Sequence, residues 1–190
     1  LLSKINMFDE SRYLQGTLKF FDIEPLQPGY KSTKAKYQGI EFRSILESLY
    51  AAMFNMCKMD FLYEQYTFEL PKILQFAPCK YTPDFYLPQQ DIFIEVKGAA
   101  MSAKEYTKVV GLADLLQGTK TWVIVLRYNR AVRSLDYYAR NSEVKLFYGD
   151  LAIGGGGGIM RREVFFQRCT MCGQFIFLKK SHPLCHFCKV

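Results

Sequence analysis

Long apolar runs are absent from the sequence, and no window approaches the roughly 18 uninterrupted apolar residues that a membrane-spanning helix needs. No secretory-signal pattern opens the chain, which begins at Leu1. Acidic residues are also fewer than basic ones, 18 against 25, so the formal net charge is +7. We therefore expect a soluble intracellular protein that has no membrane partner and that associates with a polyanion.

The positive charge is concentrated at one end of the chain. Residues 159–190 carry six Lys or Arg against one acid, a net of +5, whereas residues 1–158 carry 19 basic and 17 acidic side chains, a net of +2. Five consecutive glycines at 154–158 precede the basic segment, and glycine runs behave as flexible connections. We predict an N-terminal extension at 1–38, a core at 39–153, a glycine linker at 154–158 and a small appended module at 159–190.

The appended module contains two Cys-x-x-Cys pairs separated by twelve residues. Four thiolates at such spacing can hold Zn²⁺ tetrahedrally, as in zinc ribbons, and about 30 residues need a metal to supply their folding free energy. The alternatives are two local disulfides, or a histidine (His182 or His186) in place of one sulfur. A basic ribbon would bind nucleic acid or dock a protein. The predicted zinc ligands are Cys169, Cys172, Cys185 and Cys188, and the predicted nucleic-acid contacts are Arg161, Arg162, Arg168, Lys179 and Lys180.

The sequence of residues 80–98 predicts two short apolar strands. These strands also carry charged residues, which an apolar core would not tolerate. Asp84 lies on the first strand, and Glu95 and Lys97 lie on the second. Because strand side chains alternate between faces, Glu95 and Lys97 share one face. These three residues are candidates for a chemical site.

The connection between the two strands sets their register. If Pro88 pairs with Asp91 in a tight hairpin, Asp84 lies directly opposite Glu95, because the residue numbers of every antiparallel pair have the same sum. Opposed side chains have Cβ atoms roughly 5 Å apart, where like charges destabilise the sheet. A divalent cation such as Mg²⁺, which prefers oxygen ligands, would convert that repulsion into a site. The alternative is a polar face that meets water.

Residues 40–57 have the apolar spacing of an amphipathic helix. Glu47 falls at the border of the apolar stripe. It either pairs with Arg43 one turn back or reaches over the sheet into the site.

The other predicted elements complete a mixed chain. We expect a strand at 61–70, a helix that begins with a Ser102–Glu105 capping box and ends at Gly118, and a buried strand at 121–126. The order strand, helix, strand predicts a parallel pair joined by a right-handed crossover. A weaker helix at 131–140 and a strand at 144–148 would finish the core.

Two motifs carry a resemblance to a known family. Pro83-Asp84, followed eleven positions after the aspartate by Glu95-Val96-Lys97, resembles the PD-(D/E)XK nuclease superfamily. The string Phe42-Arg43-Ser44-Ile45-Leu46-Glu47 resembles the Phe-Arg-Ser-x-Leu-Glu helix of its phage and bacterial branch. The resemblance implies an α/β fold, a restriction-endonuclease-like αβββαβ core with a mixed sheet, to which the small four-cysteine zinc ribbon is added.

The resemblance also implies a reaction. Asp84, Glu95, the Val96 carbonyl and Glu47 would hold Mg²⁺ or Mn²⁺, and Lys97 would orient or help deprotonate the attacking water. We expect a metal-dependent DNA endonuclease of a bacterial or phage-infected cytoplasm, which leaves a 5′-phosphate and a 3′-hydroxyl. Two alternatives are a junction resolvase or recombination nuclease that acts as a homodimer on branched DNA, and a DNA-binding protein that keeps the fold without activity.

Overall fold

The computed structural model describes side chains at residues 15, 18–19, 21–26, 33–56, 58–72, 78–98, 101–119 and 121–126, and backbone alone at residue 127 and in five later strands. The chain forms two compact units, residues 1–52 and 53–190. The described elements combine helices with β-sheets, one of which is mixed, so the expected α/β class is confirmed. Within this described part, no helix is both long and apolar enough to span a membrane.

Residues 1–52 contain a three-stranded antiparallel sheet of order β1-β2-β3, formed by Glu24–Pro25, Ala35–Tyr37 and Ile40–Phe42. The two-residue turn between β2 and β3 has positive φ at Gln38 (48°) and Gly39 (82°), the backbone that tight hairpins favour. The predicted boundary at 38/39 therefore lies within a hairpin. It also follows that residues 40–42 are strand and not the first turn of the predicted helix, which begins later as α2 (Ile45–Met56).

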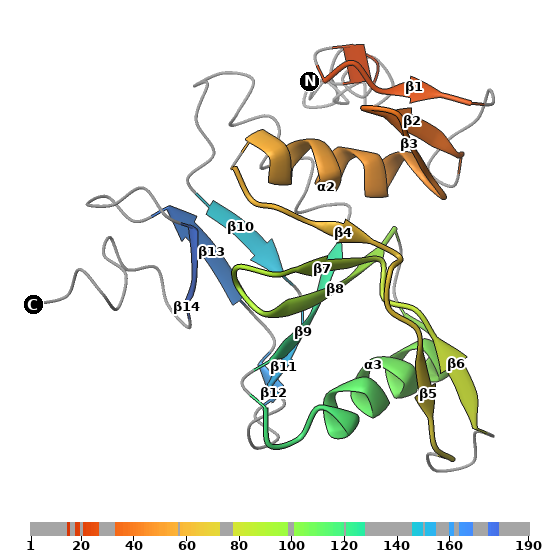
Figure 1. The fold of residues 1–190 in the computed structure, drawn as a ribbon, viewed down its shortest axis with the longest axis vertical. Helices are drawn as coiled ribbons and strands as arrows, with labels where there is room; N and C mark the ends of the chain where they lie inside the picture. Colours follow the sequence, from red (N-terminus) through yellow and green to blue (C-terminus); the bar gives the residue numbers. More distant parts are fainter. Residues whose placement is uncertain are drawn as a thin grey trace, which may run out of the picture. The chain divides into compact units, whose positions relative to one another are not determined.

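Residues 53–190 contain a six-stranded mixed sheet of order β12-β11-β9-β8-β7-β4 (Figure 1). Strands β8 and β9 pair in parallel over six residues, which confirms the parallel pair predicted from the order strand, helix, strand. The other neighbours in this sheet are antiparallel. The strands are β4 (Leu62–Tyr63), β7 (Phe85–Leu87), β8 (Ile92–Lys97), β9 (Trp122–Arg127), β11 (Leu151–Gly154) and β12 (Met160–Arg161).

The single strand predicted at 61–70 is wrong, because the segment is divided into β4 and β5 (Phe68–Leu70). Glu64, directly after β4, has φ of 49° and donates its backbone N–H to the carbonyl of Asp84 at 2.9 Å. A left-handed residue cannot continue an extended strand. Strand β5 consequently pairs with β6 (Cys79–Tyr81) in a separate two-stranded sheet.

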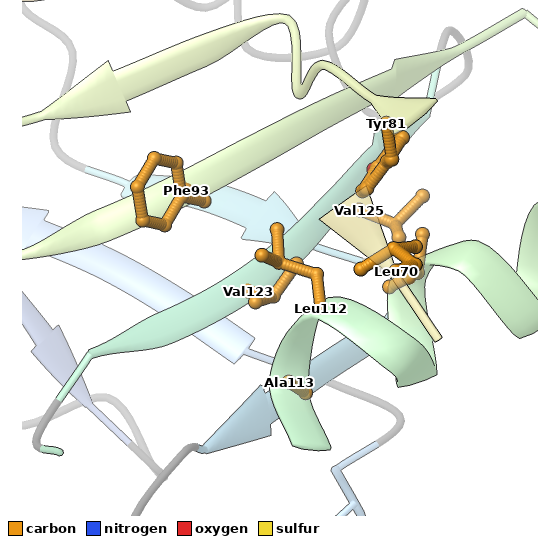
Figure 2. Packing of buried hydrophobic residues seen from close by; sticks show 8 residues of the cluster. Leu70, Tyr81, Phe93, Leu112, Ala113, Val123 and Val125 are labelled. Atoms are coloured by element: carbon orange, nitrogen blue, oxygen red, sulfur yellow. The ribbon is translucent and has the colours of Figure 1, made fainter. Parts of the chain in front are cut away.

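Helix α3 (Ala103–Leu115) covers one face of the central strands (Figure 2). Phe93, Val123 and Val125 of the sheet pack with Leu112 and Ala113 of the helix, and Leu70 and Tyr81 of the two-stranded sheet close the cluster. Phe93 therefore faces α3. By alternation along β8, Glu95 and Lys97 face the same side.

A hydrogen-bonded carboxylate joins the β7–β8 hairpin to β9. Asp91 accepts bonds from the hydroxyls of Tyr86 at 3.0 Å and Thr121 at 2.9 Å, and its backbone carbonyl accepts the N–H of Trp122 at 3.1 Å. Burial and the hydrogen bond to Asp91 raise the pKa of the Tyr86 hydroxyl, so it stays protonated and remains a donor.

Strands on the two sides of the glycine run pair with each other. Gly154 itself ends β11, which pairs with β12 beyond the run. Strand β10 (Leu146–Gly149), which corresponds to the strand predicted at 144–148, pairs with β13 (Val164–Arg168), and β13 pairs with β14 (Phe175–Leu178). Strands before the glycine run therefore share sheets with strands after it, and the linker at 154–158 stays a prediction. The helix predicted at 131–140 lies outside the described residues.

Candidate functional site

The β7–β8 hairpin has the register predicted from its turn. Phe85 pairs with Ile94 and Leu87 with Ile92, so each pair of residue numbers has the same sum as Asp84 and Glu95. Extended by one residue beyond β7, this register would set Asp84 across from Glu95. Both residues are buried, with 2% and 7% of their surface exposed. Two carboxylates thus lie out of water on the central hairpin.

Asp84 is fixed by the backbone of the opposite strand. Its Oδ2 accepts the N–H of Val96 at 2.6 Å, and its own carbonyl accepts the N–H of Glu64. A charged acceptor makes a shorter and stronger bond than a neutral one. The carboxylate is therefore held beside the residue that follows Glu95.

Each oxygen of the Glu95 carboxylate has a donor. Oε2 accepts the hydroxyl of Tyr81 at 2.8 Å, and Oε1 pairs with Nζ of Lys97 at 2.8 Å. A buried carboxylate is tolerated when it is paired and hydrogen-bonded, and these two contacts meet that condition.

Lys97, the last residue of β8, lies between two carboxylates. Its Nζ is 2.8 Å from Oε1 of Glu95 and 2.8 Å from Oε1 of Glu105 on α3. Burial by itself would lower the pKa of Lys97, but the charge of Glu95 and the hydrogen bonds to both glutamates raise it above its usual range. The side chain is therefore an ammonium group with two anionic partners.

Glu105 belongs to the capping box that begins α3, which confirms the predicted pair with Ser102. Its Oε2 accepts the N–H and the hydroxyl of Ser102, each at 2.8 Å, and its own N–H donates to Ser102 Oγ at 3.3 Å. The hydrogen bond from Lys97, and then those from Ser102, lower the pKa of Glu105 to about 2. The contact of Glu105 with Lys97 was not predicted.

Sequence reasoning thus missed two residues of the site, Tyr81 and Glu105. A signal for Glu105 exists, because only five residues separate the end of β8 from the start of α3. A side chain in the first helical turn can therefore reach back to the last residue of the strand. Tyr81 offers no comparable signal, since its strand β6 belongs to another sheet.

Glu47 is buried, and it hydrogen-bonds to two residues just before α2. Ser44 Oγ accepts the N–H of Glu47 at 3.2 Å, and the Glu47 carboxylate accepts the Ser44 hydroxyl at 2.8 Å and the backbone N–H of Arg43 at 3.2 Å. Glu47 belongs to the unit of residues 1–52, so its participation with Asp84 and Glu95 stays a prediction.

The chemistry of the donors fits a hard cation. Asp84 binds the N–H of Val96, the residue that follows Glu95, so two carboxylates and the Val96 carbonyl supply oxygen ligands of the kind that Mg²⁺ and Mn²⁺ prefer. Among the residues whose side chains are described, no group of three or more His, Cys, Asp or Glu could hold a metal ion. The fit therefore rests on two carboxylates and backbone oxygen.

The other predicted ligands lie in the C-terminal segment. The four cysteines of the zinc ribbon, with Arg162, Lys179 and Lys180, lie outside the described residues, and Arg161 and Arg168 are described by backbone alone in β12 and β13. The zinc site and the nucleic-acid contacts stay predictions.

Comparisons of the chain with protein-family models, with curated proteins and with solved structures find no match. The functional argument accordingly rests on the residues and geometry of the β7–β8 hairpin.

Proposed function

We propose that this protein is a Mg²⁺-dependent or Mn²⁺-dependent endonuclease that hydrolyses DNA phosphodiester bonds. The observation that carries the proposal is the pair of buried carboxylates on the β7–β8 hairpin, Asp84 bound to the Val96 N–H and Glu95 bound to Lys97. The helices and strands of the six-stranded sheet follow the order α2, β4, β7, β8, α3, β9, with β5 and β6 of the two-stranded sheet inserted between β4 and β7. Apart from this insertion, it is the order of the αβββαβ core implied by the resemblance, which supports the proposal.

Asp84, Glu95 and the Val96 carbonyl would hold the divalent ion, with Glu47 as a further proposed ligand. The ion, when bound, would neutralise charge that develops on the phosphate and help to activate water. Asp84 is preorganised for this role by the Val96 N–H, and Glu95 by Tyr81. Preorganised groups act without reorganisation during the reaction.

Lys97 acts as a hydrogen-bond donor and a positive charge. An ammonium group held by two carboxylates has protons to donate and no lone pair, which favours orientation of the attacking water over its deprotonation. The same positive charge would attract the anionic phosphate.

The substrate class follows from the charge of the whole chain. A net charge of +7 favours a polyanion, and five basic residues beyond the glycine run would contact phosphates. The hairpin would then supply the chemistry and the basic segment the affinity.

The test is a plasmid-nicking assay with the full chain, in Mg²⁺, in Mn²⁺ and in EDTA. Wild-type protein should convert supercoiled plasmid to the nicked form only with metal. Asp84→Asn, Glu95→Gln and Lys97→Met should each abolish nicking while DNA binding in a gel-shift assay is kept. Linear, forked and four-way DNA of equal length would show whether branched substrates are preferred.

A matched control is the exposed ion pair between Glu69 and Lys80 on β5 and β6, whose side chains are 83% and 75% exposed. Glu69→Gln and Lys80→Met should nick plasmid at the wild-type rate. Nicking at that rate by the Asp84, Glu95 or Lys97 variants would refute the site. DNA binding without cleavage in either metal would mean that the protein binds DNA and is not a nuclease.

A further inference from the structure

We infer that Glu105 is a positioning residue for the proposed nuclease reaction. It holds the Lys97 ammonium between two carboxylates, its own and that of Glu95, and thereby fixes the ammonium relative to helix α3. The inference rests on the proposed function. The juxtaposition that carries it is the placement of Lys97 Nζ at 2.8 Å from carboxylate oxygens on two different elements.

A lysine at the end of a strand needs such a constraint. Its four-carbon side chain is flexible and loses rotamer entropy when it is held in one place. With Glu95 as its only anion, the ammonium would follow a carboxylate that is itself proposed to bind the metal. The second anion, Glu105, defines a position between the two carboxylates.

Glu105 is itself held in place. Its Oε2 accepts two bonds from Ser102, so rotation of the carboxylate would break the cap of α3, and Oε1 is directed to Lys97. Helix α3 packs on the sheet through buried Val109 and Leu112. The position of the ammonium is thereby coupled to the helix that covers the sheet.

The contacts of Glu105 assign it a different role from Asp84 and Glu95. The Glu105 carboxylate contacts Lys97 and Ser102, and its side chain is 41% exposed. It acts on the reaction through Lys97 and is not a ligand of the proposed metal. Its loss should therefore change turnover without changing the metal requirement.

The experiment compares Glu105→Gln with Ser102→Ala in the full chain. Glutamine keeps a carbonyl that can accept the Ser102 N–H but removes the anion that faces Lys97. We expect kcat to fall on the order of tenfold to a hundredfold, the size of effect that misplacement of a catalytic group produces. KM for DNA and the Mg²⁺ concentration for half-maximal activity should stay within about twofold of wild type, since those contacts are not removed.

Ser102→Ala is the matched control for helix stability. It removes the hydroxyl of the same capping box but leaves the Glu105 carboxylate and the Ser102 N–H that binds it, so it should lower the stability of the protein, as cap removal does, and reduce kcat much less than Glu105→Gln. A drop in kcat equal to that of Glu105→Gln would mean that the cap, and not the ion pair, is what matters, and would overturn the inference.

A second readout needs neither metal nor DNA. In metal-free protein labelled with ¹⁵N-lysine, the Nζ protons of Lys97 should be protected from exchange with water, and the signal is assigned by its loss in Lys97→Met. Glu105→Gln should remove the protection and Ser102→Ala should keep it. Unchanged protection in Glu105→Gln, or lost protection with an unchanged kcat, would overturn the inference. An inactive wild-type protein with both metals would instead overturn the proposed function.

Discussion

The hydroxyl of Tyr81 donates a hydrogen bond of 2.8 Å to Oε2 of Glu95. Tyr81 is 6% exposed, so its removal would leave a buried carboxylate oxygen without this donor. We predict that Tyr81→Phe lowers the free energy of unfolding by about 1.5–3 kcal/mol, the range for hydrogen bonds to charged groups. It should also slow metal-dependent cleavage. Urea unfolding and the nicking assay measure the two effects.

Tyr86→Phe is the control for this change. The Tyr86 hydroxyl also donates to a carboxylate, that of Asp91, at 3.0 Å on the same hairpin but at its turn end. This variant should lose stability and keep the wild-type cleavage rate. Equal cleavage rates in the two phenylalanine variants would show that the Tyr81 hydroxyl has no part in the site.

The second prediction concerns stability and pH. Lys97 and Ser102 lower the pKa of Glu105 to about 2, from an ordinary value of 4.5. A lowered folded-state pKa contributes stability that is fully present above the ordinary value and is lost as pH falls toward the folded value. The stability difference between wild type and Glu105→Gln should therefore be largest above pH 4.5 and shrink toward pH 2.

Urea unfolding between pH 2.5 and 7 would measure this difference, with ~0.5-unit steps. Lys97→Met should weaken the dependence, because the hydrogen bond from Lys97 is the largest cause of the lowered pKa. A stability difference that is constant across this pH range would contradict the prediction.

The third prediction concerns zinc. Reduced, freshly purified protein should contain about one tightly held Zn²⁺ per chain, as expected for a four-cysteine site, and should still need added Mg²⁺ or Mn²⁺ for cleavage. Cys172→Ser and Cys185→Ser should lower the zinc content. Cys79→Ser should not, since Cys79 is a free cysteine in β6. Elemental analysis that finds no zinc in the wild-type protein would refute the ribbon.

The fourth prediction concerns DNA affinity. It is best tested in the full chain, because β12 pairs with β11, β13 pairs with β10, and β14 pairs with β13. Each phosphate contact contributes a slope of roughly −0.9 to the logarithm of affinity against the logarithm of salt concentration. Replacing Lys179 and Lys180 with Gln should weaken binding and flatten that slope. Replacing exposed Lys58 and Lys80 is the control. Equal slopes in both double variants would assign the ribbon a role other than DNA binding.

The parts of the structure that the sequence predicted depend on local chemistry. The hairpin register follows from a four-residue turn, so the pairing of Phe85 with Ile94 and of Leu87 with Ile92 was predictable once the turn was recognised. The cap of α3 follows from Ser102 and Glu105 at the required spacing. The parallel pair β8–β9 follows from an intervening helix.

The parts that were missed depend on contacts between segments. The apolar pattern of residues 40–42 suits a helix, but the residues pair with β2 across a turn that contains Gln38 at positive φ. Glu64 ends β4 with a left-handed backbone, although glutamate gives no sign of that conformation. The contact of Tyr81 with Glu95 joins β6 of the two-stranded sheet to β8 of the six-stranded sheet. The apolar periodicity of the sequence does not indicate a contact of this kind.

Asp91 has a consequence for mutations remote from the site. Its bonds to Thr121 and Trp122 pin one end of the β8–β9 ladder, while Glu95 and Lys97 lie toward the other end. A slip of β8 by one residue would exchange its two faces and move the charges of Glu95 and Lys97 to the opposite side of the sheet. Substitution of Asp91 removes the side-chain bond to the Thr121 hydroxyl, so we predict that variants selected for loss of the proposed activity recur at this turn as well as at the charged residues.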